Sequence, residues 1–170
     1  MSYLLLGFST DKKDCISKII RKITWSKFSH VVLVSPDQTS YIESIHGVGV
    51  RELPIGEFFK KGSVEIGKIS HPHPEEVWRL AKKEIGKPYD SMYIYGWLFR
   101  RNWQDDEKWA CCELVPAMAK RTGHPIIRCE EFIKVTPQML YIISSPYKGA
   151  DLKTLTNTIS KEALWLYQQL

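Results

Sequence analysis

The chain contains no long hydrophobic run. The apolar stretch around Leu4–Leu6 is too short for the core of a secretory signal, and no basic segment precedes it. No segment approaches the length that a bilayer span needs. A phosphate-binding loop, a dinucleotide fingerprint and a Gly-x-Ser-x-Gly turn are also missing. These absences argue against a secreted or membrane-spanning protein and leave the cytoplasm as the expected location.

Cysteine is scarce. The chain has four, Cys15, Cys111, Cys112 and Cys129. Because two of them are adjacent, an ordinary disulfide framework is awkward, and free thiols in a reducing compartment are the better interpretation.

The composition fits one globular domain with a modest excess of positive charge. The 170 residues are 44% hydrophobic and 25% charged, with a net charge of +5, which is ordinary for a domain with a real core. Basic residues gather around one early helix without a recognition motif, so we interpret them as a solvated helix face and expect no specific nucleic-acid partner. These residues are Lys12, Lys13, Lys18, Arg21, Lys22 and Lys27.

The first half of the chain reads as strands with two helices among them. Isoleucines recur at helical spacing through Ile23, after Asp11 and Asp14, either of which can cap the helix. β-Branched content and period-two alternation predict the strands. We expect strands at Tyr3–Phe8, Ser29–Val34, Ser40–His46, Gly47–Leu53 (a further strand or a bulged extension) and Ser63–Ile69, and a short helix at Pro54–Lys61.

The second half is mainly helical. A helix from Pro74 to Ile85 is stopped by Gly86-Lys87-Pro88, and two more are expected over Cys111–Arg121 and from Thr136-Pro137 to Ile143. Strands followed by helices predict an α+β fold with an antiparallel sheet. The segment Tyr89–Trp103 has no clean period; its aromatic residues, interpreted as pocket wall, lid or core, are Tyr93, Tyr95, Trp97, Phe99 and Trp103.

The chemistry-bearing residues are a vicinal cysteine pair at a helix start, His30 at the mouth of a strand, and Glu43 in the next strand. A thiol, an imidazole base and an acid that orients the base are the parts of a nucleophilic triad. A helix start suits a thiolate, because the helix dipole and an adjacent imidazolium both stabilise it. Cys111 and Cys112 point about 100° apart on a helix, so only one can face His30.

Four segments carry a family resemblance. The first, Thr24–Val31, runs from a helix end into a Ser-His-Val strand, and the second, Gly86–Asp90, reads Gly-Lys-Pro-Tyr-Asp. The third, Trp109–Val115, starts the cysteine helix with Trp-Ala-Cys-Cys-Glu-Leu-Val, and the fourth is the downstream Thr136-Pro137. In this order they resemble the circularly permuted branch of the NlpC-type papain-like peptidases, which includes the lecithin retinol acyltransferase relatives. The resemblance implies a permuted papain-like catalytic domain over residues 1–145. Residues 146–170 are expected to form a helical tail packed on it.

Carried over by position, the resemblance implies Cys111 as the nucleophile, His30 as the general base and Glu43 as the third residue. Cys112 stands where the family has serine and stays the alternative to Cys111 as nucleophile. The acyltransferase relatives use histidine as their third residue, so His46 stays an alternative to Glu43, as does Ser44.

Tyr89 falls where the family has a tyrosine close to the nucleophile. It is a candidate to bind substrate or to donate to the oxyanion, and the alternative is a packed aromatic next to a turn. The backbone N–H of Cys111 is the more general oxyanion donor, because amides at a helix start are unpaired.

His71-Pro72-His73-Pro74 invites a zinc hypothesis. The vicinal cysteines lack the Cys-x-x-Cys spacing of a metal knuckle, so a loop leading into the Pro74 helix is the better interpretation. We expect no metal and no cofactor.

The expected function is therefore a cysteine hydrolase that cleaves an amide bond in a peptide, a peptidoglycan-type peptide or an isopeptide, through a thioacyl intermediate. The alternatives are a lipid acyl hydrolase or acyltransferase with the same triad, and a viral or phage accessory protein that retains only the scaffold. The cell would be a bacterium or a phage-infected host.

Overall fold

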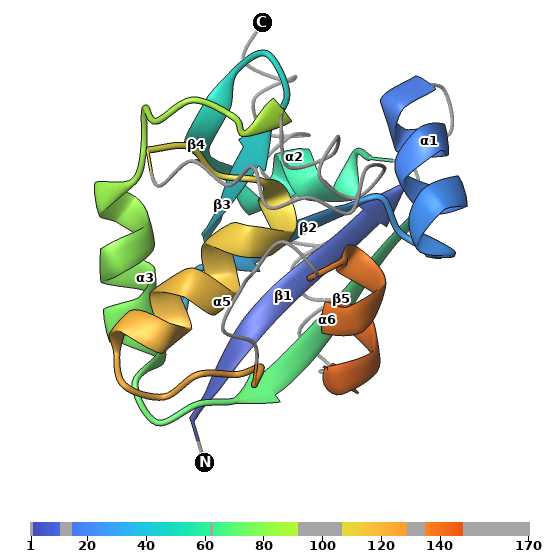
Figure 1. Cartoon of the computed structure of the whole chain (residues 1–170). Helices are drawn as coiled ribbons and strands as arrows, with labels where there is room; N and C mark the ends of the chain where they lie inside the picture. Colours follow the sequence, from blue (N-terminus) through green and yellow to red (C-terminus); the bar gives the residue numbers. More distant parts are fainter. Residues whose placement is uncertain (1, 11–14, 62, 92–106, 129–134, 148–170) are drawn as a thin grey trace, which may run out of the picture.

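A six-stranded antiparallel sheet forms the centre of the computed structural model, which describes residues 2–10, 15–61, 63–91, 107–128 and 135–147 (Figure 1). The strand order is β4-β3-β2-β1-β5-β6. The strands are β1 Tyr3–Thr10, β2 His30–Val34, β3 Ser40–Ile45, β4 Gly49–Pro54, β5 Ser63–Ser70 and β6 Ser145–Pro146. The helices are α1 Cys15–Thr24, α2 Ile55–Phe59, α3 Pro74–Lys83, α5 Cys111–Arg121 and α6 Pro137–Ile143.

The long central strand β1 organises the sheet. It pairs along its whole length with β5, from Tyr3 opposite Ser70 to Thr10 opposite Ser63, and on its other side with β2. The meander β2-β3-β4 completes that side. The predicted α+β class and antiparallel sheet are confirmed, and the strands of His30 and Glu43 are neighbours as expected.

Period-two alternation sends the strand side chains into two separate cores. On one face, side chains such as Leu6 and Leu33 pack against α3, α5 and α6. On the other face, Leu5, Val32 and Tyr41 pack against α2. Helix α5 is buried along its length, since every residue from Cys111 to Ala119 is buried, so its first residue is fixed between the sheet and the rest of the core.

The predicted elements differ from the structure mainly at their ends. Strand β4 starts at Gly49 rather than Gly47, because both glycines adopt positive φ, of 91° and 78°, in the hairpin turn. Helix α3 ends at Lys83. The two-residue strand β6 was not predicted, because so short a strand has no periodic pattern. The aromatic residues from Tyr93 to Trp103 and the tail from residue 148 lie outside the described residues.

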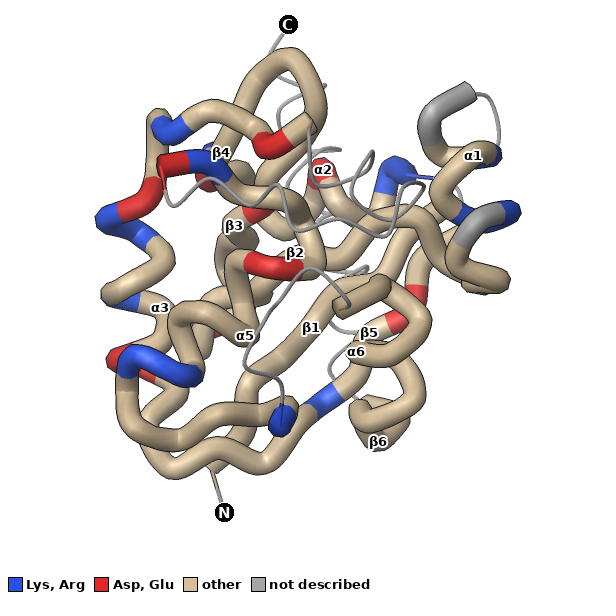
Figure 2. Tube along the Cα trace, viewed as in Figure 1, with Lys and Arg blue, Asp and Glu red and all other residues tan. Residues whose placement is uncertain are grey.

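Positive charge is prominent on α1, where the tube carries basic segments and no acidic one (Figure 2). Lys18 and Lys22 are exposed there, which agrees with a solvated helix face. Among the described helices, none combines the length and apolar character needed to cross a bilayer.

Candidate active site

The site is built where strands β2 and β3 separate. Within these two described strands, the ladder pairs Leu33 with Ile42 and Val34 with Tyr41, and no pair is formed nearer to His30. The start of α5 bridges the opening. The Ser44 hydroxyl donates to the Trp109 carbonyl at 2.5 Å, and the Val31 backbone N–H donates to the Cys111 sulfur. Residues 109–111 thus replace the missing cross-strand bonds.

Trp109 anchors this segment from the other side. Its indole Nε1 donates to Glu84 Oε2 at 2.7 Å, and its backbone N–H donates to the Pro88 carbonyl at 3.2 Å. Glu84 also accepts from Arg121 Nη1 at 2.7 Å, near the far end of α5. One buried carboxylate therefore fixes the entry to α5 and its last turn relative to α3.

The three predicted catalytic side chains meet at this opening. His30 Nε2 lies 2.8 Å from Glu43 Oε2, and the neighbouring Cys111 thiol is among the groups that raise the pKa of the imidazole. Because Nε2 is engaged by the carboxylate, Nδ1 is the nitrogen that serves the thiol. The side chain of His30 is 16% exposed and that of Glu43 is fully buried. The carboxylate is thus bonded to the imidazole, and the thiol lies beside the same ring.

The electrostatics of this chain favour a thiolate–imidazolium pair. Burial opposes charge on His30, but the hydrogen bonds to Cys111 and Glu43 outweigh it and raise the pKa of the imidazole to about 9. The pKa of the Cys111 thiol is lowered by the hydrogen bond from Cys112 and by His30, against burial. The pKa of Glu43 is also lowered against burial, by its bonds to His30 and Lys61. A charged pair at rest is what a thiol nucleophile needs.

Two cations that the sequence analysis missed complete the site. Arg51 donates to Glu43 Oε1 through Nε at 3.0 Å and Nη2 at 2.8 Å, and Lys61 Nζ donates to Oε2 at 2.5 Å. The contact of Arg51 with Glu43 could have been predicted from the sequence, because the two residues lie directly opposite each other across the β3-β4 hairpin. The contact of Lys61 with Glu43 could not have been predicted, because the position of Lys61 depends on how α2 packs.

The alternatives for the nucleophile and the third residue are placed differently. Cys112 is fully buried and its thiol hydrogen-bonds the Cys111 sulfur, so it is a neighbour of the triad. His46 is exposed and its ring packs edge-on against Tyr89, with 5.7 Å between centroids. Ser44 is committed to the Trp109 carbonyl. The described geometry gives Glu43 the contact with His30.

Tyr89 lies close to the thiol. Burial and the negative charge of Cys111 raise the pKa of Tyr89, so its hydroxyl stays protonated and can donate. Its loop is tied to β4, where the Val50 N–H donates to the Lys87 carbonyl at 2.9 Å. This approach requires Gly49, because a Cβ there would meet the Lys87 oxygen at 2.2 Å.

Both ring nitrogens of His71 hydrogen-bond backbone groups. Its Nδ1 accepts from the His73 N–H at 3.2 Å and its Nε2 donates to the His124 carbonyl at 3.0 Å, which makes it a neutral structural histidine. Among the described residues, no three His, Cys, Asp or Glu side chains form a group that could hold a metal ion.

The substitution His71→Asn should flatten the pH dependence of stability between pH 7 and 5. Burial and the nearby His73 and His124 lower the pKa of His71, so the unfolded chain binds the extra proton and the folded protein loses stability as the pH falls. Urea unfolding at several pH values measures this slope. His46→Asn, at an exposed site, should leave it unchanged; an equal slope in wild type and His71→Asn would contradict the assignment.

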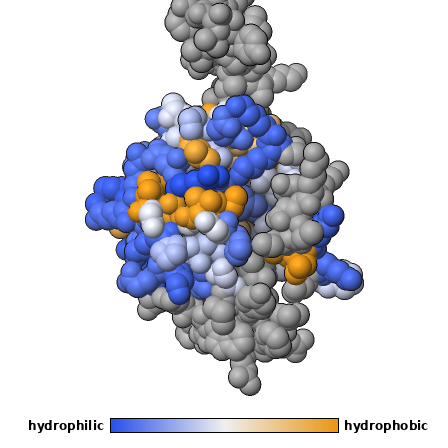
Figure 3. All heavy atoms as spheres, turned by 90° about the horizontal axis from the view of Figure 1, so that it is seen from above, coloured by the Kyte–Doolittle hydropathy of each residue, from blue (hydrophilic) through white to orange (hydrophobic). Residues whose placement is uncertain are grey.

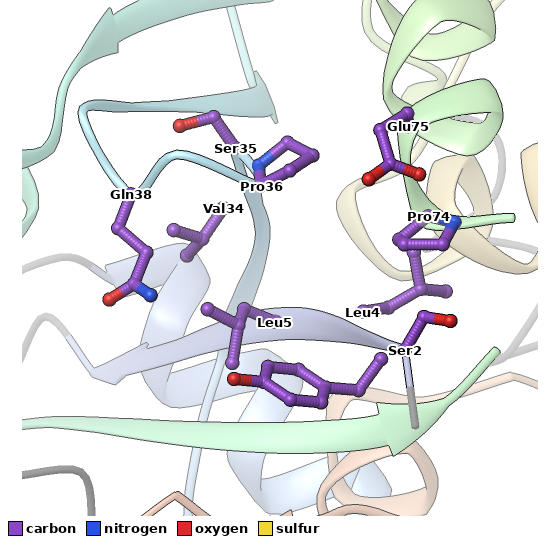
Figure 4. Close-up of a pocket in the computed structure, with 10 residues that line it drawn as sticks. Ser2, Leu4, Leu5, Val34, Ser35, Pro36, Gln38, Pro74 and Glu75 are labelled. Atoms are coloured by element: carbon purple, nitrogen blue, oxygen red, sulfur yellow. The ribbon is translucent and has the colours of Figure 1, made fainter. Parts of the chain in front are cut away.

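A hollow of about 170 Å³ lies away from the triad, between the start of β1, the β2-β3 turn and the start of α3 (Figure 4). None of the predicted site residues lines it. Its walls include Ser2, Leu4, Leu5, Val34, Gln38 and Glu75.

The surface seen from above carries a hydrophobic band bordered by hydrophilic residues (Figure 3). Val48 on the β3-β4 turn is 59% exposed, and Ile85 after α3 is 42% exposed. Their loops are joined by a hydrogen bond from the Gly86 N–H to the Val50 carbonyl at 2.9 Å. Both loops flank the Tyr89 segment.

No protein-family model matches the chain, and no curated protein matches it. Among solved structures, the chain is similar to the crystal structure of the metalloprotein yiiX from Escherichia coli O157:H7, DUF1105. The TM-score is 0.54 at 21% sequence identity, and the match covers 71% of this chain and 65% of that one. The chain thus spans less than two thirds of that protein, and the likeness extends to the fold alone.

Proposed function

We propose that the protein is a cysteine hydrolase of the permuted NlpC-type papain-like kind, which cleaves an amide bond through a thioester on Cys111. The observation that carries the proposal is the hydrogen bond between His30 and Glu43 with the Cys111 thiol beside the same imidazole. Along the sequence, the strand of the base comes first, the strand of the acid second and the nucleophile helix last. This is the order of the permuted branch. The raised pKa of His30 and the lowered pKa of Cys111 support a charged resting pair.

The first half of the proposed reaction forms the thioester. The Cys111 sulfur attacks the carbonyl carbon, and the oxygen takes the negative charge. The backbone N–H of Cys111, at the first position of α5, and the Tyr89 hydroxyl are the donors for this oxyanion. The His30 imidazolium then gives its proton to the leaving amine as the C–N bond breaks.

The second half returns the enzyme to its resting state. Neutral His30 removes a proton from water, whose oxygen attacks the thioester carbonyl. The C–S bond breaks, the carboxylic acid leaves, and the sulfur departs as thiolate beside the re-formed imidazolium. Glu43 holds the ring through both halves and stabilises its charge.

A second candidate is hydrolysis or transfer of a lipid acyl group. The exposed Val48 and Ile85, on loops that flank Tyr89, favour it because they offer an apolar surface to an acyl chain. The chemistry at Cys111 would be the same, with an alcohol rather than an amine as leaving group.

Incubation with matched peptide amides and long-chain acyl esters, followed by intact mass spectrometry, tests the proposal. We expect a hydroxylamine-sensitive acyl adduct on Cys111, and amides should acylate faster than esters under the amide proposal. Cys112→Ala should still be acylated and Cys111→Ala should not. Adducts that persist in Cys111→Ala would overturn the assignment, and faster acylation by the lipid ester would select the second candidate.

A further inference from the structure

The carboxylate of Glu43 is shared by more groups than a triad requires. Its Oε1 accepts two hydrogen bonds from Arg51, and its Oε2 accepts from both Lys61, at 2.5 Å, and His30, at 2.8 Å. The carboxylate is fully buried. Lys61 and His30 therefore compete for one oxygen.

Lys61 is held in this position by its surroundings. Its ammonium lies 5.4 Å from the ring centroid of Tyr41 and 5.9 Å from that of Phe58, and its side chain is only 26% exposed. The neighbouring Lys60 is a contrast, since it is 69% exposed and pairs with Glu57 on the surface. The ammonium of Lys61 thus lies within cation–π distance of two rings and is bonded to a buried carboxylate.

The charges that face His30 come from four elements. Glu43 on β3 and the Cys111 thiolate on α5 favour the imidazolium, whereas Lys61 after α2 disfavours it. Arg51 on β4 reaches the imidazole through Glu43, and Glu57 on α2 acts on Tyr41. Lys61 thus opposes the carboxylate and the thiolate, so the ring's proton is less tightly bound than it would be in a simple Cys-His-Glu chain.

We propose that Lys61 is a positioning residue that shares Glu43 Oε2 with His30 and so limits how tightly the imidazolium holds its proton. This role rests on the proposed function, in which His30 must first hold a proton and then deliver it to the leaving group. An acid that holds its proton less tightly delivers it more readily. Lys61 acts through Glu43 and touches no reacting atom.

The test is the titration of His30 followed by NMR in the folded protein, which needs no substrate. The His30 signal among the five histidines is identified by its loss in His30→Gln. In Lys61→Met the titration midpoint of His30 should rise by about one pH unit, the effect of removing one charge at close range. Lys61→Arg should restore the wild-type midpoint, and Lys60→Met, the matched control, should not move it.

The outcomes separate the roles. An unchanged midpoint in Lys61→Met would make Lys61 a surface partner only, and a lower midpoint would mean that it chiefly holds Glu43 in place; either result overturns the proposal. Lys61→Gln is a second variant if Lys61→Met does not fold. Because the midpoint is measured without turnover, failure to acylate Cys111 would count against the hydrolase and not against this coupling.

Discussion

Iodoacetamide at pH 6 should alkylate Cys111 at least about a hundredfold faster than Cys112, because an ordinary thiol with a pKa near 8.5 is almost wholly protonated at that pH. Cys111 has a lowered pKa from its bonds to Cys112 and His30. Cys112 is fully buried and donates its proton toward Cys111. Tandem mass spectrometry of the peptide that contains both residues locates the adduct.

Two variants control this experiment. His30→Gln removes the imidazolium and should abolish the selective reaction at pH 6. Cys112→Ala removes one hydrogen bond to the sulfur and should slow the reaction while keeping it on Cys111. Preferential labelling of Cys112 in the wild type would reverse the assignment of the nucleophile.

Glu43→Gln should slow alkylation of Cys111 at pH 6 by at least about tenfold, which corresponds to one pKa unit. The amide has one acceptor oxygen for the donors of His30, Arg51 and Lys61, so at least one of them loses its partner. Without the carboxylate the pKa of His30 falls, the thiolate loses its counter-ion, and hydrolysis slows with it. The alkylation rate and the His30 titration measure the two effects.

The same substitution should lower the free energy of unfolding at pH 7 by about 2 kcal/mol, because it removes the shared partner of partly buried cations. The pKa of Glu43 is lowered in the folded protein, so its stabilisation is present above the ordinary carboxyl pKa and fades as acid protonates it. Wild type and Glu43→Gln should therefore converge in stability at low pH. His46→Gln is the control for the rate of Cys111 alkylation at pH 6. If His46→Gln slows alkylation as much as His30→Gln does, while Glu43→Gln leaves the rate unchanged, the third residue is His46.

Local pattern was sufficient to predict the sheet and most helices. The helix over Cys111–Arg121 was predicted to the residue, because the apolar run that follows the vicinal cysteines is stopped by Gly123. The contact between His30 and Glu43 followed from adjacent antiparallel strands joined by a short turn. These features depend on neighbours in sequence, where propensity and period are reliable guides.

The rest of the site depends on contacts between distant segments. Nothing in the pattern places Lys61 on Glu43, or Glu84 on the indole of Trp109, because each contact is fixed by the packing of a helix against another element. The separation of β2 from β3 could not be predicted either, because the residues on both strands favour a continuous ladder. Residue type indicated the candidate groups, and tertiary packing determined their partners.

The gap between β2 and β3, bridged by residues 109–111, bears on how the candidate site is assembled. The β2-β3-β4 meander is a local structure that can form early, whereas the bridging segment arrives only when α5 docks. We therefore expect His30 and Glu43 to come together before Cys111 joins them. In the folded protein, we expect brief undocking of the start of α5 to separate the Cys111 thiol from His30 while the sheet stays intact, which is a local opening distinct from global unfolding.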